Sequence, residues 1–360
     1  MRFGPLEELA VGRDNNFNLL RMLAATGVLV SHAYPITLGP GALQPFQAAL
    51  GGVTLGSICV YVFFAISGFF IAQSFDRTRS RMDFLRARAL RLFPALLVVL
   101  LVTVIVAGLW LTTVLPGTYW AAVPEYMIRN LTLFKLQFEL PGVFEAVPYG
   151  PPINGSLWTL NYEVLCYAGV FLIGVLGLLR KPGVMAAIMA VIVLAYAVVM
   201  MIQPHPRLVS LADLGLPFAI GTALYVWRSW IVLDLRVALV LGLAALVLRM
   251  GGGDQVWAMA LFKPVFVLWL SYTIFLAGYW RTPTLLAYNR LGDYSYGVYI
   301  YAFPLQQLMA HLGLQTPMAN MAAAFAATLP CAVLSWHLVE GPALKLKRRR
   351  QAIDLTEVQR

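Results

Sequence analysis

Charged side chains are scarce in this chain of 360 residues. Asp, Glu, Lys and Arg together make up only 12% of it, whereas soluble domains carry about 25%. Hydrophobic residues make up 60%, and the mean hydropathy is +0.77. Because so few charges cannot cover a water-facing surface, the composition excludes a soluble enzyme and an extended nucleic-acid-binding protein.

Cysteine and histidine are also rare. The three cysteines, Cys59, Cys166 and Cys331, lie in apolar stretches, which predicts buried thiols rather than a disulfide framework. There are four histidines, and no CxxC pair or His/Cys cluster indicates a metal site. Residues 1–16 do not follow the pattern of a signal peptide, so we expect the first apolar segment to remain as a membrane span.

Apolar stretches of the length that crosses a bilayer, about 20 residues, recur along the whole chain. They predict an all-α polytopic membrane protein with about ten transmembrane helices. We expect one transmembrane domain over 1–345 and a basic tail over 346–360. The expected spans are 16–37, 53–75, 91–115, 157–179, 183–203, 208–228, 235–250, 257–280, 292–311 and 318–339, of which 235–250 is the shortest.

Basic residues give the expected orientation. Most of the 26 Lys and Arg residues fall in alternate connections and near the two ends, so we expect both termini to be cytoplasmic. The same rule accounts for the net charge of +10. The longest external segment is then 116–156, and its amphipathic middle, 125–139, predicts an interfacial or re-entrant helix. This loop either serves the function or only connects two spans.

Ionisable residues inside a span are costly, at least about 2.5–3.5 kcal/mol each, and therefore indicate a functional site. The first span holds Arg21 and His32. Their spacing of 11 residues corresponds to about three helical turns, so they share one face at an axial separation of about 16 Å. A structural role for either residue stays open, but two such groups on one face favour function.

Glu163 is the second intramembrane candidate. It lies near the external start of the fourth span, at a depth similar to that of His32. A carboxylate close to an imidazole would fix its tautomer and raise its basicity, although a Glu here can also tie down the preceding loop. Asp213 and Lys263 lie nearer to span ends, and snorkelling accounts for Lys263.

Three arginines, Arg86, Arg88 and Arg91, fall within six residues at the cytoplasmic start of the third span. One guanidinium group can bind two oxygens of a phosphate at once, so this cluster is a candidate phosphate site. The tendency of basic residues to collect on the cytoplasmic side explains the same cluster without any ligand.

Taken together, these segments resemble the bacterial membrane acyltransferase family called acyltransferase 3, and they are close to its polysaccharide and lipopolysaccharide O-acetyltransferase members. The resemblance covers nearly the whole chain, with Arg21, His32 and Glu163 at family motif positions. The matching segments, in order, are NNFNLLRMLAATGVLVSH, CVYVFFAISGFFIAQSF, FLRARALRLFPALL, SLWTLNYEVLCYA, LGDYSYGVYIYAFPLQQ and SWHLVEGPALK.

The resemblance implies transfer of an acyl group, usually acetyl, from cytoplasmic acetyl-CoA to a sugar hydroxyl of an exported glycan. Acetyl-CoA would be a substrate, with no bound cofactor. The implied partners are acyl-CoA, a glycan or lipid-linked saccharide and membrane lipids, with no nucleic acid. The implied location is the bacterial inner membrane. The sequence leaves open the acceptor sugar, the acyl chain and the oligomeric state.

The resemblance also implies residue roles. His32 and Glu163 would be catalytic, with His32 acting either as a general base or as the carrier of an acyl-histidine intermediate. The donor would be held by Arg21 and by the three arginines of the third span. Candidates for lining the acceptor site are Asn154, Trp158, Tyr299 and Gln306.

Two positions depart from the family pattern. Ala302 stands where many members have a histidine, and Val164 stands where many have a second glutamate. A histidine at the position of Ala302 therefore cannot take part in the mechanism here. Two other classes remain as alternatives: a transporter or flippase for a glycan or lipid precursor, and a catalytically silent scaffold.

Overall fold

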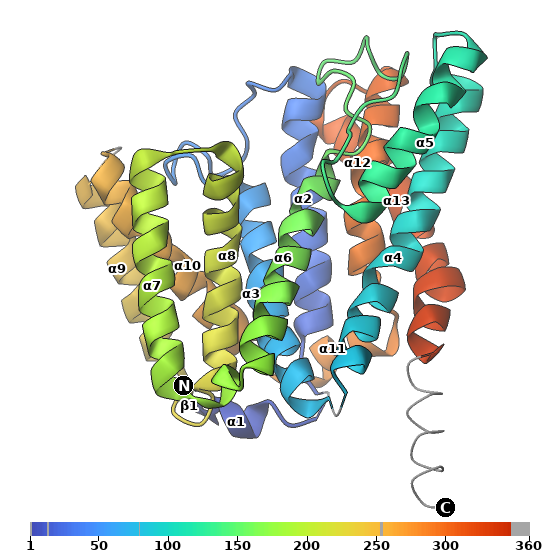
Figure 1. Cartoon of the computed structure of the whole chain (residues 1–360). Helices are drawn as coiled ribbons and strands as arrows, with labels where there is room; N and C mark the ends of the chain where they lie inside the picture. Colours follow the sequence, from blue (N-terminus) through green and yellow to red (C-terminus); the bar gives the residue numbers. More distant parts are fainter. Residues whose placement is uncertain (1, 13, 79, 253–254, 347–360) are drawn as a thin grey trace, which may run out of the picture. The chain divides into compact units, whose positions relative to one another are not determined.

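The computed structural model describes residues 2–12, 14–78, 80–252 and 255–346, and helices make up most of them (Figure 1). The chain divides into two compact units. Unit 1 consists of Met1–Ala24, Pro45–Arg77 and Tyr162–Leu291, and unit 2 of Ala25–Gln44, Thr78–Asn161 and Gly292–Arg360. Helices α2 (Phe17–Leu38) and α6 (Trp158–Val175) each contribute residues to both units. Of the expected tail at 346–360, residues 347–360 lie outside the described part.

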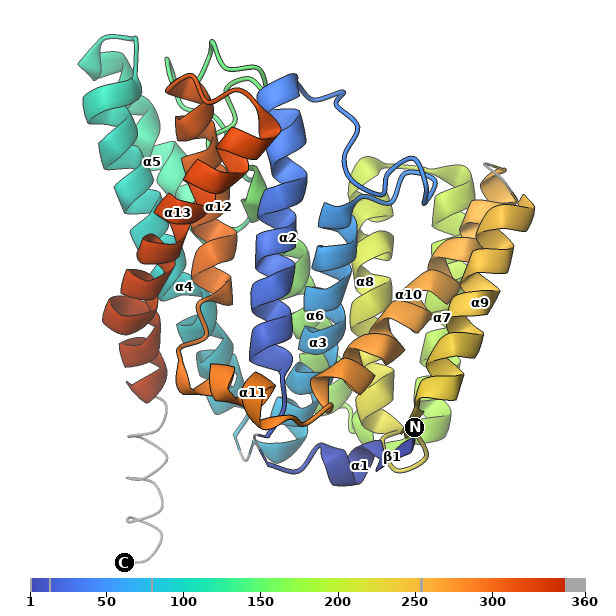
Figure 2. The ribbon, with the colours of Figure 1, turned by 180° about the vertical axis from the view of Figure 1, so that it is seen from behind.

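Unit 1 contains most of the remaining helices and a small sheet. Strands β1 and β2 pair antiparallel, with Gly4 opposite Leu233. Figure 2 shows α9 lying against α10. The further elements of this unit are β1 (Arg2–Pro5), α1 (Leu6–Leu9), α3 (Leu55–Arg77), η3 (Leu178–Arg180), α7 (Pro182–Ile202), α8 (Pro206–Val226), β2 (Val232–Asp234), α9 (Leu235–Gly252), α10 (Val256–Gly278), α11 (Pro283–Leu286) and η4 (Ala287–Arg290).

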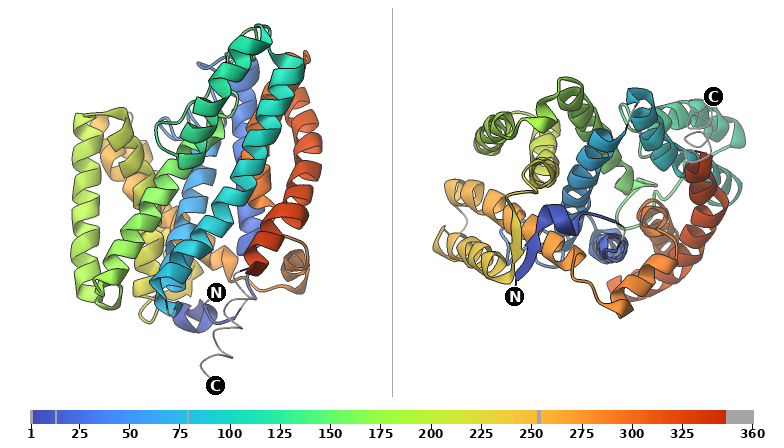
Figure 3. Two further views of the ribbon diagram at one scale, coloured as in Figure 1. Left: turned by 45° about the vertical axis from the view of Figure 1, so that its right-hand side comes forward. Right: turned by 90° about the horizontal axis from the view of Figure 1, so that it is seen from below.

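Unit 2 is built around a long helix that ends in a π-helical turn. Figure 3 shows this helix, α4, beside α5, and α12 packs against α13. A second π-helical turn, η5, continues α13. The elements are α4 (Arg81–Val106), η1 (Ala107–Leu111), α5 (Pro116–Thr132), η2 (Gly155–Leu157), α12 (Ser295–His311), α13 (Pro317–Ser335) and η5 (Trp336–Glu340).

Within the described residues, nine helices are long and apolar enough to cross a membrane. They confirm an all-α polytopic membrane protein and coincide with nine of the expected spans, including the short one at 235–250. The remaining expected span, 292–311, corresponds to α12. Its 17 residues would extend about 26 Å, slightly less than the hydrocarbon core of a bilayer.

Glycines allow α3 and α8 of unit 1 to pack at very short range. A Cβ atom added at Gly68 would lie 2.0 Å from the carbonyl oxygen of Phe218, and one at Gly221 would lie 2.0 Å from that of Ala65. The hydroxyl of Thr222 also donates across this contact to the carbonyl of Gly68, at 3.2 Å. Small residues paired with a hydroxyl are typical of helix packing inside membranes.

Two predicted boundaries were wrong. The third span begins at Arg81 rather than near 91, so the arginine cluster is part of a continuous helix. The helix expected over 125–139 is instead α5, which begins at Pro116, because proline favours the first turn of a helix. It ends before Leu133, which adopts a left-handed conformation with φ 55°.

Candidate active site

His32 lies in the part of α2 that belongs to unit 2. Its ring meets the ring of Phe303 in α12 edge to face, with centroids 5.3 Å apart and an interplanar angle of 79°. The side chain is partly accessible, yet its Nδ1 is buried and has no hydrogen-bond partner among the described residues. Buried polar atoms are rarely left without a partner, so this nitrogen indicates a functional site.

Phe303 connects the histidine to the loop of residues 133–154. The ring of Tyr149 packs against Phe303 with centroids 5.5 Å apart. Gly155 faces the same ring, and a Cβ atom added there would lie 2.7 Å from Phe303 Cε2. Burial raises the pKa of the Tyr149 phenol, so it stays protonated at neutral pH. The histidine is thus positioned by packing of aromatic rings.

Gln306 lies one turn beyond Phe303 and links three helices of unit 2. Its Nε2 donates to the carbonyl of Leu29 in α2, at 2.9 Å, and to Oδ1 of Asn320 in α13, at 3.3 Å. Asn320 returns a bond from its own Nδ2 to the carbonyl of Gln306. Leu29 is one turn from His32, so these amides fix the helical segment that carries the histidine.

Two of the four residues predicted to line an acceptor site, Asn154 and Tyr299, each bond to a residue close to the other in the chain, within unit 2. Asn154 is buried, and its Nδ2 donates to the carbonyl of Ile300 at 2.9 Å. The buried hydroxyl of Tyr299 contacts the hydroxyl of Thr159 and donates to the carbonyl of Ser156. Trp158, by contrast, is 38% exposed. Hydrogen bonds occupy Asn154, Tyr299 and the Nε2 of Gln306, whereas Oε1 of Gln306 has no partner among the described residues. The acceptor role of all four residues stays a prediction.

The three arginines of the cluster lie on two different faces of α4. Arg88 and Arg91 lie about 60° apart around the helix, whereas Arg86 points well away from both. Arg91 is held by two carboxylates: one of its nitrogens is 2.6 Å from Oδ2 of Asp293, and the other is 3.5 Å from Oε2 of Glu340. Arg86 is half exposed. Phosphate binding by the cluster therefore stays a prediction, with Arg91 already engaged in ion pairs.

Glu163 and Arg21 belong to unit 1, and each is described within that unit. The carboxylate of Glu163 accepts hydrogen bonds from the hydroxyls of Ser67, at 3.5 Å, and Tyr167. Both bonds end on Oε1, which leaves Oε2 for another partner. The guanidinium of Arg21 lies 5.9 Å from the centre of the Phe70 ring.

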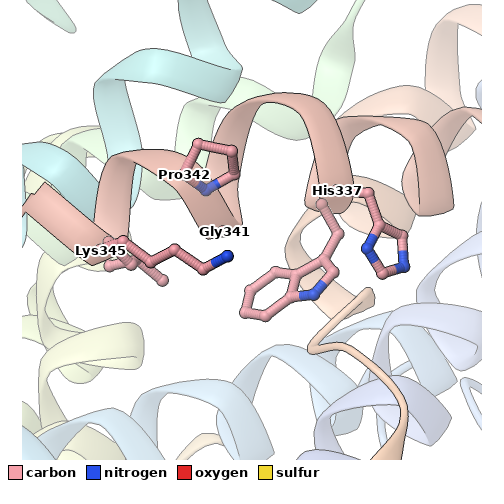
Figure 4. A pocket seen from close by; sticks show the side chains of 6 residues that line it. His337, Gly341, Pro342 and Lys345 are labelled. Atoms are coloured by element: carbon pink, nitrogen blue, oxygen red, sulfur yellow. The ribbon is translucent and has the colours of Figure 1, made fainter.

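A pocket of 220 Å³ lies beside the end of η5, and none of the residues predicted for the active site lines it (Figure 4). Its lining consists of Trp336, His337, Gly341, Pro342, Leu344 and Lys345. His337 is also 3.2 Å from the hydroxyl of Tyr294. Across the ranges that the structure describes, no group of three or more His, Cys, Asp or Glu side chains is arranged to hold a metal ion.

The apolar helices, with polar and ionisable side chains inside them, define a polytopic membrane protein with a candidate active site. The chain belongs to the acyltransferase 3 family: the family model, described as an acyltransferase domain, matches residues 14–337. It is therefore an acyltransferase. No solved structure matches the chain.

Several curated proteins are similar to this chain over most of their length. The "O-acetyl transferase" of Shigella phage Sf6 is 29% identical, with 95% of this chain and 99% of the phage protein covered. "Nodulation protein 10" of Rhizobium leguminosarum bv. viciae is 26% identical, with 96% and 97% covered. The "Exopolysaccharide production protein ExoZ" of Rhizobium meliloti (strain 1021) is 28% identical, with 83% and 92% covered.

Several residues that build the site are not predicted by the sequence. Phe303 and Gln307 stand out only in the structure, where Gln307 donates to the carbonyls of Gly150 and Pro152 and holds the loop. Two adjacent glutamines inside an apolar span were an available signal, because such amides need partners there. Asp293 and Glu340 were equally visible as acidic residues beside spans, but nothing local links them to Arg91.

Proposed function

We propose that this protein is an integral-membrane O-acetyltransferase that transfers acetyl from cytoplasmic acetyl-CoA to a sugar hydroxyl of an exported or cell-surface glycan. The observation that carries the proposal is the family match over residues 14–337. Relatives named for O-acetyl transfer and exopolysaccharide production support the reaction and the acceptor class. We place the protein in a bacterial inner membrane with both termini in the cytoplasm.

His32 has the central chemical role in this proposal. The imidazole removes the proton of the sugar hydroxyl while the oxygen attacks the thioester carbonyl carbon. The new C–O bond forms, the C–S bond breaks, and the CoA thiolate leaves and takes up the proton. In the alternative mechanism, the imidazole first attacks the thioester and carries the acetyl group as an acyl-histidine, which then transfers it to the sugar hydroxyl. The buried Nδ1 without a described partner supports a functional imidazole.

The remaining roles are assigned by chemistry. Glu163 would stabilise the imidazolium, and its carboxylate is ordered by Tyr167 and Ser67. Arg21 and Arg88 would hold the donor phosphates, whereas Arg86 lies on the other side of α4 and Arg91 is engaged by Asp293 and Glu340. The family assignment favours catalysis over the transporter and scaffold alternatives.

The test uses purified protein in liposomes, radiolabelled acetyl-CoA and a panel of bacterial glycans. We expect base-labile label on a glycan, and we expect His32→Ala to lower the rate about 10²- to 10⁴-fold. His205→Ala is a matched control, because His205 is exposed and its Nδ1 accepts from the backbone N–H of Arg207 in the first turn of α8, outside the proposed site. Failure of the wild-type protein to label any glycan, or a normal rate for His32→Ala, would contradict the proposal. Acid quenching without acceptor would detect a labelled His32.

A further inference from the structure

A charged cluster inside unit 1 has no place in the acetyl-transfer chemistry above. Lys263 Nζ lies 3.6 Å from Oδ1 of Asp213, and the hydroxyl of Tyr61 donates to the other oxygen, Oδ2, at 2.7 Å. The ion pair is partly accessible, with 26% of the Asp213 side chain and 25% of the Lys263 side chain exposed. Charged residues in membrane spans face the bundle interior or a water-filled cavity, pair with one another, and mark functional sites.

The cluster lies at one depth in four helices that pack against one another. Helix α8 packs against α3, α7 and α10, and α10 also contacts α3 and α7 (Figures 1 and 2). The count starts from the N-terminal end of α3, α8 and α10, and from the C-terminal end of α7, which runs in the opposite direction. Each residue lies six or seven positions from that end: Tyr61, Tyr196, Asp213 and Lys263. That spacing corresponds to about 10 Å below the helix ends.

Tyr196 supplies the second, independent observation. This residue is only 2% exposed, yet its hydroxyl has no hydrogen-bond partner among the described residues. It lies within electrostatic reach of both Tyr61 and Asp213. A phenol buried without a partner destabilises the free protein, so an ion pair alone does not explain why a tyrosine, rather than a phenylalanine, occupies this position.

We propose that Tyr61, Tyr196, Asp213 and Lys263 form a binding site for a neutral, hydroxyl-rich ligand. In the proposed function, on which this assignment rests, the ligand is a sugar unit of the acceptor. The ligand is neutral because the charges of Asp213 and Lys263 cancel. The carboxylate accepts hydrogen bonds from sugar hydroxyls, the ammonium donates to them, and the Tyr196 hydroxyl gains the partner it lacks.

The experiment measures saccharide binding apart from catalysis. His32→Ala protein without acetyl-CoA is titrated with glucose, galactose, rhamnose and N-acetylglucosamine, and with glucuronate as an anionic probe. The readouts are calorimetric affinity and the melting temperature. We expect saturable binding of at least one neutral sugar. Adding Tyr196→Phe weakens it roughly three- to tenfold, as the loss of one hydrogen bond predicts, without lowering the melting temperature of the free protein.

Tyr119→Phe is the matched control. Tyr119 is also buried, but its hydroxyl already donates to the carbonyl of Val104 at 2.8 Å. This variant should lower the melting temperature and leave sugar affinity unchanged. The proposal is overturned if no neutral sugar binds, if glucuronate binds more tightly, or if Tyr196→Phe binds like its parent. Because no acetyl transfer is measured, failure of the proposed reaction would be seen separately.

Discussion

The imidazole of His32 stands edge to face against the ring of Phe303, with centroids 5.3 Å apart. Packing, rather than a hydrogen bond to Nδ1 from a described residue, therefore sets the plane of this ring. The contact joins α2 to α12 within unit 2 and gives Phe303 a positioning role.

Phe303→Leu should lower kcat about ten- to a hundredfold and change KM little, because a misplaced catalytic group loses rate rather than binding. Phe134→Leu, at an exposed loop position, is the control. The comparison requires kcat and KM for both variants with labelled acetyl-CoA. Equal losses for the two variants would show that Phe303 does not position the histidine.

Glu163→Gln should reduce acetyl transfer strongly, by about 10²-fold or more, because an amide cannot stabilise an imidazolium as a carboxylate does. Tyr167→Phe should give a smaller loss, since it removes only one of the two hydroxyls that order the carboxylate. Steady-state rates and melting temperatures of both variants check this order. Wild-type turnover of Glu163→Gln would make Glu163 a structural residue.

Arg91→Ala should destabilise the protein by about 3–5 kcal/mol, because it leaves the buried Glu340 without its counter-charge. Unfolding of the detergent-solubilised protein measures the effect. Adding Glu340→Gln should recover part of the loss. If Arg91→Ala is as stable as wild type and binds acetyl-CoA weakly, Arg91 binds the donor and does not stabilise the fold.

Arg88→Lys should weaken acetyl-CoA binding about tenfold, because lysine keeps the charge but loses the paired contact with phosphate. Insertion should be unchanged, since lysine satisfies the charge rule for orientation equally well. Arg86→Lys, on the other side of α4, should bind the donor normally. Titration calorimetry measures acetyl-CoA affinity, and a cysteine-accessibility assay measures insertion. Normal binding by Arg88→Lys would show that the arginine cluster only helps to orient the protein in the membrane.

Gly68→Ala should destabilise unit 1 by about 1–3 kcal/mol, because its Cβ would lie 2.0 Å from the carbonyl oxygen of Phe218. Gly215→Ala on α8 is the control, since no atom lies within 4 Å of a Cβ added there. The control should be neutral or stabilising by up to about 1 kcal/mol. Thermal unfolding compares the two, and similar melting temperatures would refute the close helix contact.

Local sequence was sufficient for the class of the protein and for most of its spans. Hydropathy is summed over neighbouring residues, so even the shortest span, 235–250, was located correctly. The boundaries of α4 and α5 were missed, because a charged segment and a proline look like loop signals although both continue or start a helix. The family motifs were also readable, since each occupies a continuous segment.

The partners of the site residues came only from the tertiary structure. Arg91 reaches Asp293 and Glu340, which are 202 and 249 positions away, and no local pattern encodes such pairs. The sequence therefore determined the class, a membrane acyltransferase, and predicted His32 and Glu163 as its catalytic residues. The fold decided which polar groups are satisfied, as in Asn154, and which keep an atom without a partner among the described residues, as in His32, because hydrogen bonding inside a bundle depends on packing between distant segments.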